Sequence, residues 1–147
     1  MAFCILQKKT FLQQPSTFQV YNASAGSGKT YTLVKEYLKV ILTSENIFSF
    51  QKILAITFTN KAAGEMKERV LSSLEDFANG KENELFNILI QEMNVDKKMI
   101  QERSKKVWVA ILQNYSAFSI TTIDSFTQRI IKNFAYDLGL SLNFEVE

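Results

Sequence analysis

With 147 residues, one cysteine (Cys4) and no histidine, the chain can build one modest core but no internal disulfide, no Ser–His–Asp or Cys–His catalytic group and no typical zinc site. No apolar run approaches the roughly 20 residues of a membrane helix, and Met1–Leu6 is too short and lacks a basic leader for a signal peptide, so we expect a cytoplasmic protein without membrane contact. The net charge of +2 divides unevenly: residues 1–72 carry nine Lys/Arg and four Asp/Glu, and residues 73–147 carry eight and eleven, a basic first half that suits an anionic ligand or a plain solvated surface equally well.

The first half of the chain alternates predicted strands and helices. A short strand over residues 18–22 runs into a glycine-rich turn, and a helix begins at Lys29 and ends at 44–46. Residues 52–57 form the short apolar run that is typical of a strand buried on both faces of a parallel sheet. A second helix follows and closes at Asn79-Gly80. The residues predicted on the buried faces of the two helices are Leu33, Tyr37, Leu38, Ile41, Leu42, Ala63, Met66, Val70, Leu74 and Phe77.

The second half begins with helices alone. Residues 82–115 look helical throughout, and we interpret 78–115 as a helical insertion. A third strand is predicted over 118–122, followed by a helix from about Asp124, whose predicted buried side carries Phe126, Ile130, Ile131 and Phe134. This order predicts an α/β fold, a parallel sheet flanked by helices. Because three strands make a small sheet, we expect the domain to be incomplete.

A glycine-rich segment between the first strand and the first helix fits the phosphate-loop pattern G-x-x-x-x-G-K-[ST], except that alanine replaces the first glycine. Small residues let backbone N–H groups surround phosphate oxygens, and the positive end of the helix faces the same anion. Lys29 and Thr30 are the predicted catalytic residues: Lys29 would neutralise the β- and γ-phosphates, and the Thr30 hydroxyl would ligate Mg²⁺. The alternative is a flexible turn with a surface lysine. The predicted ATP-binding residues are Ala23, Ser24, Ala25, Gly26, Ser27, Gly28, Lys29 and Thr30.

The second strand leads into residues 55–66, which read A-I-T-F-T-N-K-A-A-G-E-M. A loop at the carboxyl end of a parallel strand lies beside the nucleotide site. This loop offers hydrogen-bonding groups for phosphate and sugar, a ring that can stack on a base, and a cation. None of them suits the reading of a base edge, so any nucleic acid bound by this loop would be bound independently of its sequence. The residues concerned are Thr57, Phe58, Thr59, Asn60 and Lys61.

Some of these residues have plainer explanations. Asn60 is suited to cap the following helix, alone or in addition to binding nucleic acid. For Phe58 the alternative, which we favour less, is a place in the hydrophobic core. Glu65 and Arg69 are spaced four residues apart, so their plainer explanation is an ion pair on the helix surface.

The spelling T-F-T-N-K-A-A-x-E-M closely resembles motif Ia of superfamily 1 DNA helicases of the UvrD/RecB group, in which this segment lies along single-stranded DNA. Residues 118–129, F-S-I-T-T-I-D-S-F-T-Q-R, resemble a second DNA-contacting turn of that family, spelled T-I-H-S-F. Thr122, Ser125 and Phe126 match that pattern, whereas Asp124 stands where histidine is usual. An acidic side chain would repel a phosphate, so we expect Asp124 to cap the helix instead.

The A-S-A-G-S-G-K-T spelling resembles the RecB/AddA branch of that group, whose helicase–nuclease subunits process broken DNA ends. This resemblance implies single-stranded DNA and duplex junctions or ends as partners, and a nuclease subunit or a fused nuclease domain. It also implies a glutamine that recognises adenine, for which Gln13 or Gln14 lies at a plausible distance; a solvated glutamine pair is the alternative. A cluster of cations either contacts duplex phosphates or forms a solvated helix face. The cluster is Lys97, Lys98, Arg103, Lys105 and Lys106.

The resemblance implies that residues 1–147 are the N-terminal portion of a UvrD-like helicase ATP-binding domain with a RecA-like P-loop NTPase fold. It implies an ATP-dependent DNA helicase that uses ATP and Mg²⁺, translocates from 3′ to 5′ and serves DNA repair or recombination. A motor also needs an Asp-Glu pair after a later strand, and none follows Ile120. We therefore expect the 147 residues alone to bind ATP without hydrolysing it at a useful rate. The alternatives are a non-catalytic ATP- and DNA-binding fragment and a small phosphotransferase, against which the T-F-T-N-K-A-A motif argues.

Overall fold

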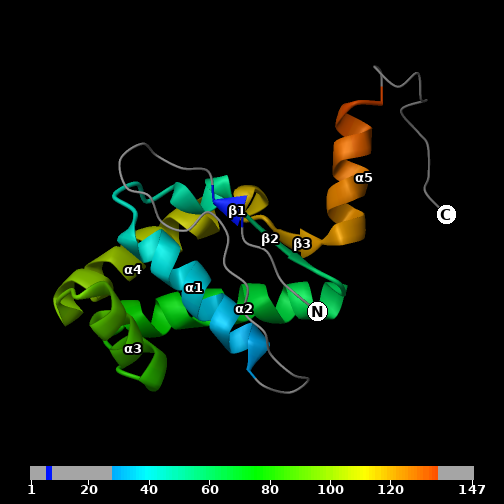
Figure 1. Ribbon diagram of the computed structural model, residues 1–147. Coiled ribbons are helices and arrows are strands. Elements are labelled where there is room, and N and C mark those ends of the chain that lie inside the picture. The colour runs from blue at the N-terminus through cyan, green and yellow to red at the C-terminus, as the bar shows by residue number, and fades with distance from the viewer. Residues whose placement is uncertain (1–5, 8–27, 136–147) are drawn as a thin grey trace.

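The computed structural model describes residues 6–7 and 28–135 (Figure 1). The predicted strand over residues 18–22 lies outside this part of the chain. Five helices, three strands and two 3₁₀ helices are described, and the bounds of the first two helices and of the second strand agree closely with the predicted ones. The region 82–115, predicted to be helical throughout, instead contains two helices separated at residues 94–96. In chain order the elements are β1 (Leu6–Gln7), α1 (Lys29–Thr43), η1 (Ser49–Lys52), β2 (Ile53–Thr57), α2 (Asn60–Ala78), α3 (Glu84–Met93), α4 (Lys97–Gln113), η2 (Tyr115–Ala117), β3 (Ile120–Thr122) and α5 (Ile123–Asn133).

The sheet has the order β1-β2-β3. β2 and β3 run parallel, with Ala55 opposite Ile120 and Thr57 opposite Thr122. Buried and half-buried residues alternate along β2, so both of its faces are covered, as expected for a central strand of a parallel sheet. The two residues of β1 pair antiparallel with β2, which the sequence did not predict because a two-residue strand has no recognisable period. The parallel β2–β3 pair confirms the α/β prediction in its coarse form.

The helices α1 to α4 share one buried cluster with β2 and β3. Nine of the ten residues predicted on the buried faces of α1 and α2 are buried, and Leu33 packs against the cluster half-buried. The segment interpreted as an insertion contributes to this same core instead of standing apart from it. Its buried members are Leu85, Phe86, Leu89, Ile100, Val107, Ala110 and Ile111. In the described part of the chain, no helix combines the length and the apolar composition needed to cross a membrane.

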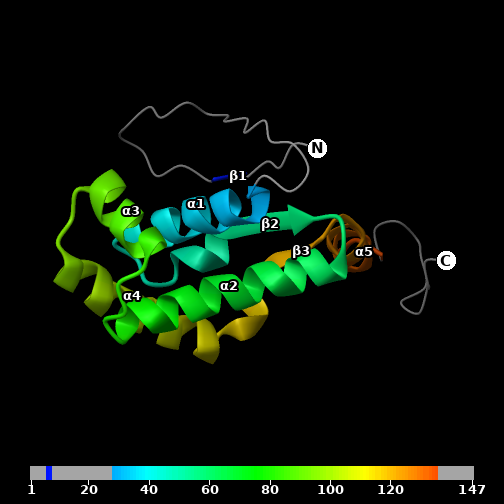
Figure 2. The same ribbon diagram turned by 90° about the horizontal axis from the view of Figure 1, so that it is seen from below.

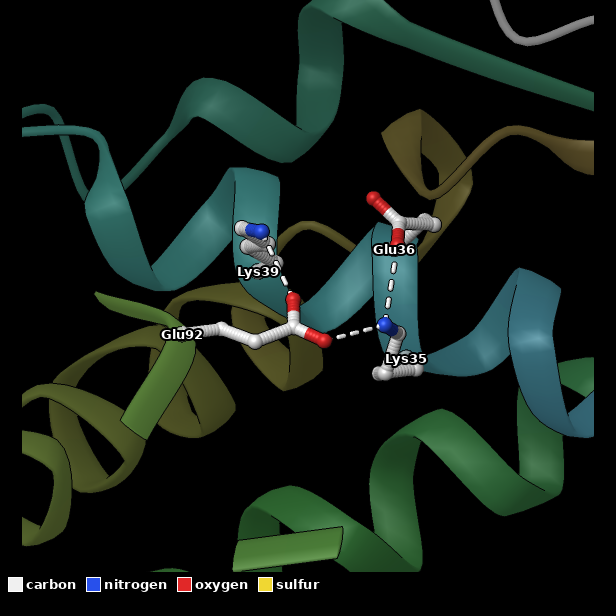
Figure 3. Close-up of polar contacts among 4 residues, drawn as sticks. All are labelled: Lys35, Glu36, Lys39 and Glu92. Carbon is white, nitrogen blue, oxygen red and sulfur yellow. Dashed lines mark hydrogen bonds and ion pairs between the residues drawn. The ribbon is translucent and has the colours of Figure 1, made fainter. Parts of the chain in front are cut away.

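A charged contact ties α3 to α1 (Figure 3). The Glu92 carboxylate accepts a hydrogen bond from Lys39 Nζ at 2.7 Å and another from Lys35 Nζ, which also lies 3.2 Å from Glu36. The bonds from Lys35 and Lys39 hold the pKa of Glu92 below its usual value. Burial lowers the pKa of Lys35, but its bonds to Glu92 and Glu36 outweigh burial and raise the pKa overall. Because these side chains are partly exposed, we expect the contact to contribute little to stability.

The last helix differs from the prediction. α5 has no buried residue, and Ile130 and Phe134 are 41% and 55% exposed. Phe126 and Ile131 are half-buried. The prediction that Phe126, Ile130, Ile131 and Phe134 form a buried side is therefore wrong, because none of the four is buried. Figure 1 shows α5 standing apart from the other helices beyond the end of β3, and Figure 2 shows α3 at the opposite end of the molecule. Periodicity identifies the apolar face of a helix, but it does not reveal whether another element covers that face.

Candidate nucleotide and nucleic-acid site

The described part of the predicted phosphate loop is Gly28, Lys29 and Thr30, since residues 23–27 lie outside the described residues. Gly28 is the N-cap of α1 with a φ of 75°, a left-handed conformation that glycine adopts at little cost. A Cβ at this position would meet no atom within 4 Å, so the backbone conformation and not the available space requires glycine. Lys29 and Thr30 open a helix with no acidic residue in its first turn. A helix N-terminus of this kind, with free N–H groups and a positive dipole end, fits a bound phosphate.

The end of β2 is shaped by threonine hydroxyls. Thr57 is 3% exposed, and its Oγ1 donates to the Thr59 carbonyl oxygen at 3.1 Å, with the Thr121 carbonyl oxygen of β3 at 3.4 Å. Thr59 Oγ1 accepts a hydrogen bond from the Ala62 N–H at 3.1 Å and caps α2. The suggestion that Asn60 caps this helix is therefore wrong, because Asn60 is the first residue inside α2. Thr57 and Thr59 hold the turn in place.

The residues carried by this turn face solvent. Phe58 is 50% exposed, and Thr59, Asn60 and Lys61 are exposed as well. The alternative that Phe58 belongs to the hydrophobic core is therefore wrong. The carboxyl end of β2 thus presents an aromatic ring, an amide and a cation to solvent within four consecutive residues.

The end of β3 is built in a similar way. Thr122, which is 4% exposed, accepts a hydrogen bond from the Ser125 N–H at 3.2 Å and donates to Ser125 Oγ at 2.9 Å. Thr122 is therefore the N-cap of α5, and the expectation that Asp124 caps this helix is wrong. Asp124 lies exposed in the first turn, where a carboxylate interacts favourably with the positive end of the helix. The side chain of Ser125 is exposed, and that of Phe126 is half-buried.

The two strand ends lie together. Thr57 and Thr122 are opposite each other in the parallel register, and the Thr57 hydroxyl reaches the backbone of β3. The turns that follow the two strands therefore leave the sheet at the same edge. The fold brings the predicted groups Thr57–Lys61 and Thr122–Phe126 into one region although they are more than 60 positions apart along the chain.

Two further residues of this region were not predicted. Ile123 lies between Thr122 and Asp124 and is 43% exposed. The guanidinium carbon Cζ of Arg129 lies 5.9 Å from the centroid of the Phe126 ring. The spacing of three residues between an aromatic and a basic side chain on one helix was the available signal, because such residues are neighbours on a helix surface.

The cations predicted to form a cluster on α4 are in different surroundings. Lys97 Nζ pairs with Glu82 Oε2 at 2.6 Å. The Nε and Nη2 atoms of Arg103 are buried, and neither has a hydrogen-bond partner in the described part of the chain. Lys98, Lys105 and Lys106 are exposed. The five residues therefore do not present one continuous cationic surface.

A groove of about 340 Å³ lies between α1, α2 and the start of α3. Tyr31, Val34 and Arg69 are among the residues that line it. Arg69 makes no ion pair with Glu65 within the described residues, so the suggested surface pair is absent. None of the predicted site residues lines this groove, although Tyr31 directly follows Thr30.

The chain is similar to a known protein family and to several known proteins. The profile of the UvrD/REP helicase N-terminal domain matches residues 6–147. An ATP-dependent helicase/nuclease subunit from Bacillus cytotoxicus is 33% identical over 124 residues, which cover 84% of this chain and 8% of that protein. The protein of the same name from Clostridioides difficile is 36% identical with the same coverage. That of Clostridium kluyveri is 31% identical over 139 residues, 95% of this chain and 10% of its own length. No solved structure matches the chain significantly. The chain thus spans a tenth or less of the length of these relatives.

Proposed function

Because the chain belongs to the UvrD/REP helicase family through its N-terminal domain, we propose that it is the ATP- and DNA-binding segment of a helicase motor. The family match confirms the resemblance to the UvrD/RecB group that the motifs indicated, and the names of the relatives agree with the RecB/AddA branch. Those names describe ATP-dependent helicase/nuclease subunits, which supports the use of ATP and DNA by this chain.

The residues at the start of α1 would hold the nucleotide. Gly28 turns the backbone towards the phosphates, Lys29 neutralises their charge, and Thr30 offers a hydroxyl to Mg²⁺. The free N–H groups and the dipole of α1 favour an anion at this end, and no acidic residue of the first turn opposes it. Bound ATP and Mg²⁺ would supply the phosphoryl transfer that drives movement. The residues of this chain would bind and orient the triphosphate.

The shared edge at the ends of β2 and β3 would bind single-stranded DNA. Direct contacts would come from the exposed or half-buried residues Phe58, Thr59, Asn60, Lys61, Ser125 and Phe126. Phe58 would support a base by stacking, and the polar groups would contact phosphate and sugar, so that binding is independent of sequence. The predicted contributions of Thr57 and Thr122 would be indirect, because both are almost fully buried and their hydroxyls hold the two turns.

The wider role follows from the family. We propose 3′ to 5′ translocation in DNA repair or recombination, in the cytoplasm, on single strands, duplex junctions or ends, with a nuclease in the same protein or assembly. The words nuclease and subunit in the names of the relatives support the last point. The second candidate is a non-catalytic ATP- and DNA-binding fragment. It is favoured by one observation, which is that neither β2 nor β3 is followed by an Asp-Glu pair that could hold Mg²⁺ and activate water.

The observation that carries the proposal is the register of β2 and β3, which brings two helicase-like motifs to one edge beside exposed Phe58. Lys29→Ala should lower ATP affinity at least about tenfold, because a charge-assisted contact to phosphate is lost, and it should leave oligonucleotide affinity unchanged. Lys52→Ala, an exposed lysine at the opposite end of β2, is the matched control. If ATP affinity survives in Lys29→Ala, the phosphate-loop assignment is wrong. DNA-stimulated ATP turnover by the 147-residue chain would exclude the non-catalytic candidate.

A further inference from the structure

The first two turns of α5 carry a row of side chains that continues the proposed DNA-binding edge. Thr122, Ser125, Phe126 and Arg129 are spaced at i, i+3, i+4 and i+7, which places them along one face of the helix. Ser125 and Phe126 belong to the predicted site, whereas Arg129 does not. Arg129 therefore lies next along the same surface, further out on the helix that stands apart from the core (Figure 1).

The Arg129 guanidinium contacts the Phe126 ring and is also exposed to solvent, where a ligand can reach it. Its Cζ atom lies 5.9 Å from the centroid of the Phe126 ring, a distance at which the cation is attracted to the face of the ring. The side chain is exposed, and among residues 28–135 it forms no ion pair. A guanidinium that lies over a ring keeps the N–H donors at its edge free, and their fork matches two oxygens of one phosphate.

We propose that Arg129 is a phosphate-binding residue for single-stranded DNA and that Phe126 positions its guanidinium. The inference rests on the proposed function and extends its DNA-binding edge by one helical turn. Because the ring restricts the guanidinium before DNA arrives, less side-chain freedom is lost on binding. Arg129 touches the DNA backbone, and Phe126 acts through Arg129 in addition to any contact of its own.

The test is a salt titration of binding. A fluorescently labelled oligothymidine is titrated with the intact 147-residue chain at several KCl concentrations, and the logarithm of the association constant is plotted against the logarithm of the salt concentration. Arg129→Gln should weaken binding and make the slope shallower by about 0.7, the value for one phosphate contact to a single strand. Arg129→Lys and Phe126→Leu should keep the slope, because the charge remains, and should weaken binding by roughly twofold to fivefold, because the contact between ring and guanidinium is lost. Arg129→Lys also loses the guanidinium fork, and Phe126→Leu also loses any contact of the ring with DNA.

Lys52→Gln is the matched control, because it removes the same charge from an exposed residue at the far end of β2. If Arg129→Gln changes affinity and slope no more than Lys52→Gln does, the role of Arg129 is overturned. If Phe126→Leu binds like the wild type, the positioning role of Phe126 is overturned.

A third variant, Asn60→Ala, separates this inference from the proposed function. Weaker binding in Asn60→Ala together with wild-type binding in Arg129→Gln would reject Arg129 and keep the DNA-binding edge. Absence of oligothymidine binding by the wild-type chain would reject both. Far-UV circular dichroism of each variant checks that α5 still forms.

Discussion

Among the residues that the structure describes, aromatic side chains differ sharply between the core and the ends of β2 and β3. In the core, Phe50, Phe77, Phe86 and Phe118 are at most 2% exposed and form two pairs, with ring centroids 5.1 Å apart for Phe77 and Phe86 and 6.5 Å apart for Phe50 and Phe118. At the ends of β2 and β3, Phe58 is 50% exposed and Phe126 is half-buried, and Ile123 nearby is 43% exposed. Large exposed apolar side chains that gather at one edge mark a surface that binds something. The comparison teaches that the helices around α2 bury the aromatic side chains that stabilise the fold, whereas the ends of β2 and β3 leave theirs accessible for the binding role that we propose.

The largest expected effect concerns the aromatic side chains of the core. Phe118 packs edge-on against Tyr37, Phe50 and Tyr115, so Phe118→Ala should lower the free energy of unfolding by about 3–5 kcal/mol. Phe58→Ala removes the same side chain from an exposed position and should change it by no more than about 0.5 kcal/mol. Urea unfolding measures both values. Similar losses in the two variants would show that the two regions do not differ as described.

The next effect concerns the junction between the regions. Thr122→Val removes the hydroxyl that caps α5 and should lower the free energy of unfolding by about 1 kcal/mol. Thr122→Ser keeps the hydroxyl and should lose much less, which separates capping from packing. Thermal unfolding followed by circular dichroism is the measurement. A Thr122→Ser variant as unstable as Thr122→Val would contradict the capping role.

The next prediction concerns the buried hydroxyl of Tyr37 in the core. Its ring is fully buried, its hydroxyl has no hydrogen-bond partner among the described residues, and burial raises the pKa of the phenol above 10.0. Tyr37→Phe should therefore raise the free energy of unfolding by up to about 1 kcal/mol, because an unsatisfied polar group leaves the core.

The same residue gives a pH dependence. Burial raises the pKa of Tyr37 in the folded protein, so above pH 10 the phenol ionises first in the unfolded chain. The ionisation of Tyr37 therefore leaves the free energy of unfolding unchanged below pH 10 and lowers it as the pH rises beyond 10. Tyr37→Phe should lose less stability than the wild type between neutral pH and pH 11. Equal losses in urea unfolding at the two pH values would contradict the burial of an unpaired hydroxyl.

The smallest effect concerns the contact between α1 and α3 in Figure 3. Glu92→Gln should lower the free energy of unfolding by less than about 1 kcal/mol at pH 7, because the contact is partly exposed. The pKa of Glu92 is lowered from 4.5, so its stabilisation is present above that pH and is lost as the pH falls further. Urea unfolding at pH 7 and pH 3 checks this, with Glu102→Gln as control, because Glu102 is an exposed carboxylate in the interior of α4 that forms no ion pair among the described residues. A larger loss of unfolding free energy in the control than in Glu92→Gln would contradict a stabilising contact between Glu92 and α1.

The sequence predicted most of the core and identified the motifs at the two strand ends for one physical reason, which is that both depend on local patterns. Apolar spacing identified the buried faces of α1 and α2, and the length of the apolar run identified β2. The two helicase-like motifs stood directly after predicted parallel strands, and such strands end at one edge of a sheet.

What the sequence did not predict depends on three-dimensional partners. Periodicity identified the apolar face of α5 but not that this face is uncovered in the described part of the chain. Asn60 and Asp124 are good capping residues by type, yet the backbone places Thr59 and Thr122 at the capping positions. The contact between Arg129 and Phe126 follows from their spacing on one helix, but the position of that helix face beside the end of β2 is visible only once β3 is paired with β2.

The most direct measurement of the central claim is the affinity of the intact chain for a labelled single-stranded oligonucleotide of arbitrary sequence, with Phe58→Ala and Phe134→Ala compared under identical salt. Both variants remove an exposed phenylalanine, but only Phe58 lies at the end of β2. The account predicts that Phe58→Ala loses about 1–3 kcal/mol of binding free energy, the value of one base stacked on an aromatic ring, and that Phe134→Ala binds like the wild type. Wild-type affinity in Phe58→Ala would contradict the assignment of this edge as a DNA-binding surface.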